Sequence, residues 1–110
     1  MEPKAETVIR MRVVKKNAYC PIFNLGDEVV IKKHCFDTSI NRLERYCYAT
    51  LSDIYPVYAK LRKEPVGTTE LFRCRDNGII EIEVERLADE RYDYENAGRV
   101  WAPAPTGRKL

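Results

Sequence analysis

The chain has 110 residues and a formal net charge of +2, with 45% hydrophobic and 33% charged residues. This composition suits one domain with a single modest core, and it excludes two separate cores. The charge is uneven, because residues 1–63 carry 12 basic and 7 acidic side chains while residues 64–110 carry 7 and 10. Pairing of a basic strand with an acidic strand is the simpler explanation, although the same asymmetry would also steer an anionic partner.

The N-terminal half predicts two strands. After a polar arm at residues 1–6, apolar side chains alternate with Arg10 and Arg12, which is typical of a half-buried strand. Residues 17–27 predict a loop, because they contain Cys-Pro and Asn-Leu-Gly turn signals. A second strand is expected at residues 28–33, where apolar side chains again share one face.

The stretch at residues 46–63 predicts the main helix. Its apolar residues recur at helical spacing on one face, namely Cys47, Leu51, Ile54, Tyr55, Tyr58 and Leu61. Pro56 lacks the N–H that would bond the carbonyl of Ser52, so we expect either a kink or a second helical piece with Asp53 as its N-cap. Residues 34–46 hold several capping residues and predict a short helical turn before the main helix.

The C-terminal half predicts a hairpin. Residues 69–75 form a third strand, and the Asp-Asn-Gly sequence at residues 76–78 is a tight-turn signal. A fourth strand at residues 78–86 alternates strictly between apolar and acidic side chains. Its inward-facing residues are Ile80, Ile82 and Val84, and its outward-facing residues are Glu81, Glu83 and Glu85. The glutamates are expected to pair with the arginines of the first strand.

These elements predict an α+β fold in the order β-β-α-β-β. We expect a small antiparallel or mixed four-stranded sheet whose apolar face is covered by the one main helix. The domain then occupies residues 7–87, and residues 88–110 form an extended C-terminal arm. The arm contains the only tryptophan, Trp101, which suits docking into a groove in extended form.

Familiar functional motifs do not occur in this sequence. It has no CxxC, HExxH, GxGxxG or GxxxxGK[ST] pattern, and one histidine, His34, cannot support sites that need several imidazoles. Neither a secretory apolar region near Met1 nor a membrane span is present, so we expect a cytoplasmic protein with no membrane partner. Basic and aromatic residues alternate only weakly, and the fourth strand is acidic, so we expect no nucleic-acid partner.

The cysteines permit two interpretations. Cys20, Cys35, Cys47 and Cys74 are separated by 14, 11 and 26 residues. Metal sites usually take two thiolates from one tight turn, and no such pair exists, so we predict no metal site. The simpler interpretation makes Cys47 and Cys74 small buried hydrophobic residues in a reducing compartment. The alternative is a reactive thiolate, for which Cys47 has a suitable place at the start of the helix.

Short motifs also occur in a recognisable order: Cys20-Pro21, Leu25-Gly26-Asp27-Glu28, Cys47 with Ala49 and Leu51, Tyr55-Pro56, Leu61-Arg62, and Cys74 with Asp76. Over residues 8–87 this set resembles a family of short, uncharacterised bacterial and archaeal proteins. The resemblance implies that Cys20, Cys47 and Cys74 belong to a shared site or a shared core. It implies no activity, and Arg75 stands where the family tends to have proline.

The sequence therefore predicts a non-enzymatic binding or accessory protein that self-associates, or docks a protein partner, through its C-terminal arm. The alternative is a cysteine-dependent metal, iron–sulfur or redox protein. Tyrosines on the helix face suggest either an aromatic-lined cavity or rings packed on the sheet with hydroxyls in water. The candidate binding residues are Cys20, Cys47, Cys74, Tyr55, Tyr58 and Trp101. No substrate or cofactor follows from the sequence.

Overall fold

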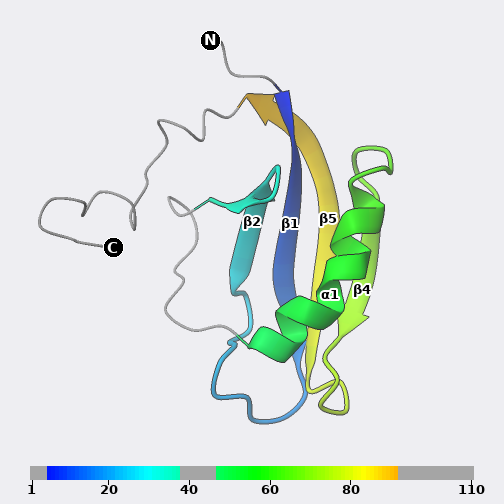
Figure 1. Ribbon diagram of the computed structural model, residues 1–110. Coiled ribbons are helices and arrows are strands. Elements are labelled where there is room, and N and C mark those ends of the chain that lie inside the picture. Colours follow the sequence, from blue (N-terminus) through cyan, green and yellow to red (C-terminus); the bar gives the residue numbers. More distant parts are fainter. Residues whose placement is uncertain (1–4, 38–46, 92–110) are drawn as a thin grey trace, which may run out of the picture.

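The computed structural model describes residues 5–37 and 47–91 (Figure 1). Within them, five strands form one antiparallel sheet in the order β3-β2-β1-β5-β4, and one helix lies against one of its faces. The elements are β1 (Ala5–Lys16), β2 (Glu28–Lys32), β3 (Cys35–Phe36), α1 (Tyr48–Leu61), β4 (Thr69–Arg73) and β5 (Ile80–Arg91). The expected α+β class is confirmed, and the sheet is antiparallel rather than mixed.

The sheet has one strand more than the four predicted. β3 pairs with β2 across a two-residue turn, with Lys32 opposite Cys35. Lys33 in this turn has a φ of 61°, a left-handed conformation that turns usually give to glycine or asparagine. The sequence therefore carries no turn signal here, and the strand was missed. The helical turn predicted within residues 34–46 lies largely outside the described residues.

The two longest strands, β1 and β5, pair at the centre of the sheet. Their register runs from Ala5 opposite Arg91 to Lys16 opposite Ile80, with irregularities near Val8 and Val13. Both strands extend beyond the predicted ends, into residues that were assigned to the two arms. The polar and charged side chains at those ends do not alternate with apolar ones, so periodicity could not detect the extra pairs.

Strand alternation places the core on the face that carries the helix. Its buried apolar side chains include Ile9, Met11, Val13, Ile31, Ile80, Ile82 and Val84 from the sheet. On the opposite face Arg10 forms an ion pair with Glu85, and Arg12 pairs with Glu83 at 3.3 Å. The predicted pairing of the basic strand with the acidic strand is therefore confirmed.

The main helix is continuous through Pro56, and its ribbon changes direction along its length (Figure 1). Asp53 does not begin a second helix. The helix buries Thr50, Ile54, Tyr58 and Leu61. Tyr55, predicted on the buried face, is 57% exposed. No helix among the described residues has the length and apolar character needed to cross a membrane.

A buried lysine joins the edge of the sheet to the end of β5. The Lys32 ammonium lies 2.9 Å from carboxylate oxygens of both Asp37 and Glu90. The side chains of Lys32 and Asp37 are only 12% and 6% exposed. Burial acts to lower the pKa of Lys32, but its hydrogen bonds to the two carboxylates outweigh this effect and raise it.

Candidate functional site

Three of the four cysteines line one cavity of about 330 Å³. Cys20 comes from the β1–β2 loop, Cys47 immediately precedes α1, and Cys74 immediately follows β4. All three are partly exposed, and all three also pack against the hydrophobic core. Cys35, on β3, is not among the lining residues. The fold thus brings together three thiols from distant parts of the sequence.

Backbone N–H groups hold two of the thiols. The Sγ atom of Cys20 accepts from the amide of Phe23 at 3.5 Å, and that of Cys74 accepts from the amide of Ile80 at 3.4 Å. The second contact depends on the predicted turn at residues 76–78, in which Asn77 has a φ of 57°. These contacts fix the positions of two sulfur atoms at the cavity wall.

Cys47 occupies the N-cap position of α1, next to the free amides of the first helical turn. Its side chain makes no capping hydrogen bond of full geometry, but several donors surround it. The Thr50 hydroxyl, the amides of Thr50 and Ala49, and the charge of Arg75 together lower the pKa of the Cys47 thiol, against the opposing effect of burial. A helix N-terminus with a nearby cation is a typical setting for a reactive thiolate.

Arg75, which also lines the thiol cavity, is fixed by a two-pronged contact with the helix. Its Nε and Nη2 atoms donate to the two carboxylate oxygens of Asp53, each at 2.7 Å. This contact lowers the pKa of Asp53, and it holds the guanidinium near Cys47.

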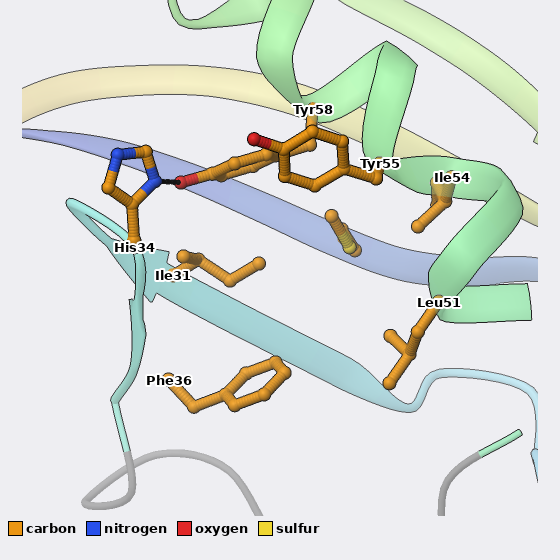
Figure 2. A pocket seen from close by; sticks show the side chains of 8 residues that line it. Ile31, His34, Phe36, Leu51, Ile54, Tyr55 and Tyr58 are labelled. Carbon is orange, nitrogen blue, oxygen red and sulfur yellow. Dashed lines mark hydrogen bonds between the residues drawn. The ribbon is translucent and has the colours of Figure 1, made fainter. Parts of the chain in front are cut away.

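The two candidate tyrosines lie in a different cavity. Tyr55 and Tyr58 line a mainly apolar space of about 210 Å³ between α1 and strands β1 to β3 (Figure 2). The Tyr58 hydroxyl lies 2.7 Å from Nδ1 of His34 and also donates to the carbonyl of Lys33. Burial raises the pKa of Tyr58. Trp101, the last candidate, lies outside the described residues.

The five candidate residues within the described part of the chain therefore divide between two cavities. A third, much smaller cavity of about 20 Å³ lies between the other two along the helix. It shares Leu51 and Ile54 with the tyrosine cavity, and Phe23 and Thr50 with the thiol cavity. Among residues 5–37 and 47–91, no three side chains of His, Cys, Asp or Glu are arranged to hold a metal ion.

Sequence reasoning missed three residues of these sites. Thr50 is three positions after Cys47, the spacing at which an N-cap side chain meets a helix amide, so it was detectable. Arg75 directly follows Cys74, but its pairing with the helix carries no sequence signal. His34 reaches Tyr58 only because the β2–β3 turn lies beside the helix, which is a long-range property of the fold.

Comparisons with known proteins give no information about these cavities. The chain matches no protein-family model, no curated protein and no solved structure. The two larger cavities are therefore interpreted from their own residues.

Proposed function

We propose that this protein is a thiol-dependent redox protein in which Cys47 is the nucleophile. The observation that carries the proposal is the position of Cys47, which has a lowered pKa at the start of α1 and lines one cavity with two further thiols. A cysteine that only fills space has no need of a thiolate-stabilising environment. Lowered thiol pKa values are characteristic of cysteines that react.

The chemistry is exchange with a small disulfide. The Cys47 thiolate attacks one sulfur of the substrate, which forms a mixed disulfide and releases the other half as a thiolate. Cys20 or Cys74 then attacks the Cys47 sulfur as a thiolate, having given its proton to water, and expels the second half. The substrate is reduced by two electrons to two thiols, and the protein is oxidised by two electrons to an internal disulfide.

The cavity is consistent with a small substrate. It is lined mainly by apolar side chains, and its polar lining residues include Thr50, Arg75 and Asp76. Its volume of about 330 Å³ lies at the lower end of the range of roughly 300–1,000 Å³ for small-molecule sites. Partial exposure of the three cysteines gives such a molecule access to sulfur.

The test is reaction of the fully reduced protein with one equivalent of oxidised glutathione under anaerobic conditions. We expect two thiols released per disulfide and a protein lighter by two hydrogen atoms in intact-mass spectrometry. Cys47→Ser should abolish this reaction. Cys35→Ser should leave it unchanged, because Cys35 lies outside the cavity. Of Cys20→Ser and Cys74→Ser, the variant that lacks the second attacking thiol should stop the reaction at the mixed disulfide.

Two outcomes would overturn the proposal. Equal reaction rates in Cys47→Ser and the unaltered protein would remove its nucleophile. Stoichiometric zinc or iron in anaerobically purified protein, lost in the Cys20, Cys47 and Cys74 variants, would replace redox chemistry with metal binding. Self-association through the C-terminal arm stays a separate prediction, because residues 92–110 lie outside the described part of the chain.

A further inference from the structure

The tyrosine cavity exists because one helix cannot cover five strands. Five strands at about 4.8 Å spacing span about 19 Å between the outer strand axes, whereas a helix with its side chains is only about 10–12 Å across. α1 lies closest to β4 and β5, so its side chains fill only part of the space over β1 to β3 (Figure 1). Met11, Ile31 and Phe36 line the remaining space from the sheet side.

One end of this cavity is polar, and its hydrogen bonds have a determined direction. A guanidinium can only donate, so the 2.9 Å contact from Nη1 of Arg62 makes Nε2 of His34 an acceptor. Nδ1 of His34 therefore carries the proton and donates to the Tyr58 oxygen, while the Tyr58 hydroxyl donates to the carbonyl of Lys33. Figure 2 shows His34 and Tyr58 meeting at this end of the cavity.

Arg62 has bonding capacity that these contacts do not use. Its Nε–H is buried and has no hydrogen-bond partner, and among the described residues no carboxylate forms an ion pair with its guanidinium. The guanidinium carbon lies 5.9 Å from the centre of the Tyr58 ring, so the charge adjoins the cavity. A buried donor without a partner is rare in folded proteins and calls for a physical explanation.

We propose that this cavity binds a small carboxylate with an aromatic or branched apolar body. The carboxylate would accept a charge-assisted hydrogen bond from Nη2 of Arg62, at the end of the cavity where Arg62 meets His34. The body would lie against the Tyr55 and Tyr58 rings, whose centres are 5.6 Å apart, and against Phe36. The site does not involve the thiols, so it stands independently of the redox proposal.

The cavity volume restricts the ligand to about one ring. Its 210 Å³ is below the range of roughly 300–1,000 Å³ in which drug-sized ligands bind. A ligand of this size forms few contacts, so we expect dissociation constants of about 1 mM. 3-Phenylpropionate is a suitable probe, and its neutral amide has the same shape without the charge.

Methyl NMR titration of the full chain tests the proposal. With 3-phenylpropionate, we expect saturable shifts of the methyl groups of Met11, Ile31 and Ile54, which line the cavity, and none for Ile80 in the thiol cavity. The amide should bind about tenfold more weakly, because it lacks the charge that Arg62 recognises. This comparison uses the unaltered protein and does not depend on the folding of any variant.

Arg62→Met then separates recognition from a structural role. If Arg62 holds the carboxylate, the variant should lose the preference for acid over amide while its affinity for the amide stays unchanged. Equal binding of acid and amide by the unaltered protein would overturn the proposal. The absence of shifts at a 3-phenylpropionate concentration tenfold above the expected dissociation constant would overturn it as well. Concentration-dependent shifts of the same methyls without ligand would instead identify a second copy of the chain as the occupant.

Discussion

Truncation of Ile82 to alanine tests the assignment of the two sheet faces. Ile82 is 5% exposed near the start of β5, where it lies opposite Val13 of β1 and Phe72 of β4. The change removes three carbons, which corresponds to about 2.4 kcal/mol of transfer free energy at roughly 0.8 kcal/mol per carbon. Residual space adds about 24 cal/mol per Å³, or about 1.2 kcal/mol for an unfilled volume of about 50 Å³.

We therefore expect Ile82→Ala to lower the free energy of unfolding by about 3 to 4 kcal/mol. Ile82 already borders the smallest cavity, so the vacated space would join an existing void rather than close. The assay is urea denaturation followed by circular dichroism, with comparison of midpoints at equal slope. Leu71→Ala is the matched control, because Leu71 is 51% exposed on the opposite face and should change stability by less than about 0.5 kcal/mol. Equal losses in the two variants would refute the face assignment.

Two further predictions concern charge. Because the pKa of Cys47 is lowered, its alkylation rate should rise with pH through a midpoint below the ordinary thiol pKa of about 8.5. Thr50→Val should move that midpoint upward. Arg75→Gln should move it upward by less, since the Thr50 hydroxyl contributes most to the lowered pKa and Arg75 contributes least. An unchanged pH profile in Thr50→Val would contradict this. Lys32→Met should lower the free energy of unfolding by about 1–3 kcal/mol, because it removes a cation that is paired with a buried carboxylate, whereas Lys60→Met, which breaks a solvent-exposed pair, should have a much smaller effect. Similar denaturation midpoints for these two lysine variants would rule out the burial argument.

Periodicity in the sequence was a good guide to the centre of the fold. The alternation at Ile80, Ile82 and Val84 predicted the buried face of β5, and the helical spacing at residues 46–63 predicted α1 to within two residues at each end. It failed where the pattern is short or absent. β3 has only two residues, and the ends of β1 and β5 pair through their backbones without apolar side chains to mark them.

The candidate sites were less accessible to sequence reasoning, because they depend on contacts between distant segments. The grouping of Cys20, Cys47 and Cys74 came only as an implication of the resemblance, and the fold places the three around one cavity. An aromatic-lined cavity was one of two alternatives for the tyrosines, and Tyr55 and Tyr58 do line one, but the sequence did not indicate His34 and Arg62 at its polar end. Their contact requires that the β2–β3 turn meet the end of α1, which no local pattern encodes.

The measurement that tests the central claim most directly is the order in which the four cysteines react. Native, reduced protein is exposed to limiting iodoacetamide at neutral pH, and the labelled peptides are quantified over time. Activation by the helix N-terminus and its donors predicts that Cys47 is labelled first, well ahead of Cys35, which is also partly exposed but lies outside the thiol cavity. Labelling of Cys35 at the same rate as Cys47 would show that the site does not activate its thiol, and would contradict the proposed function.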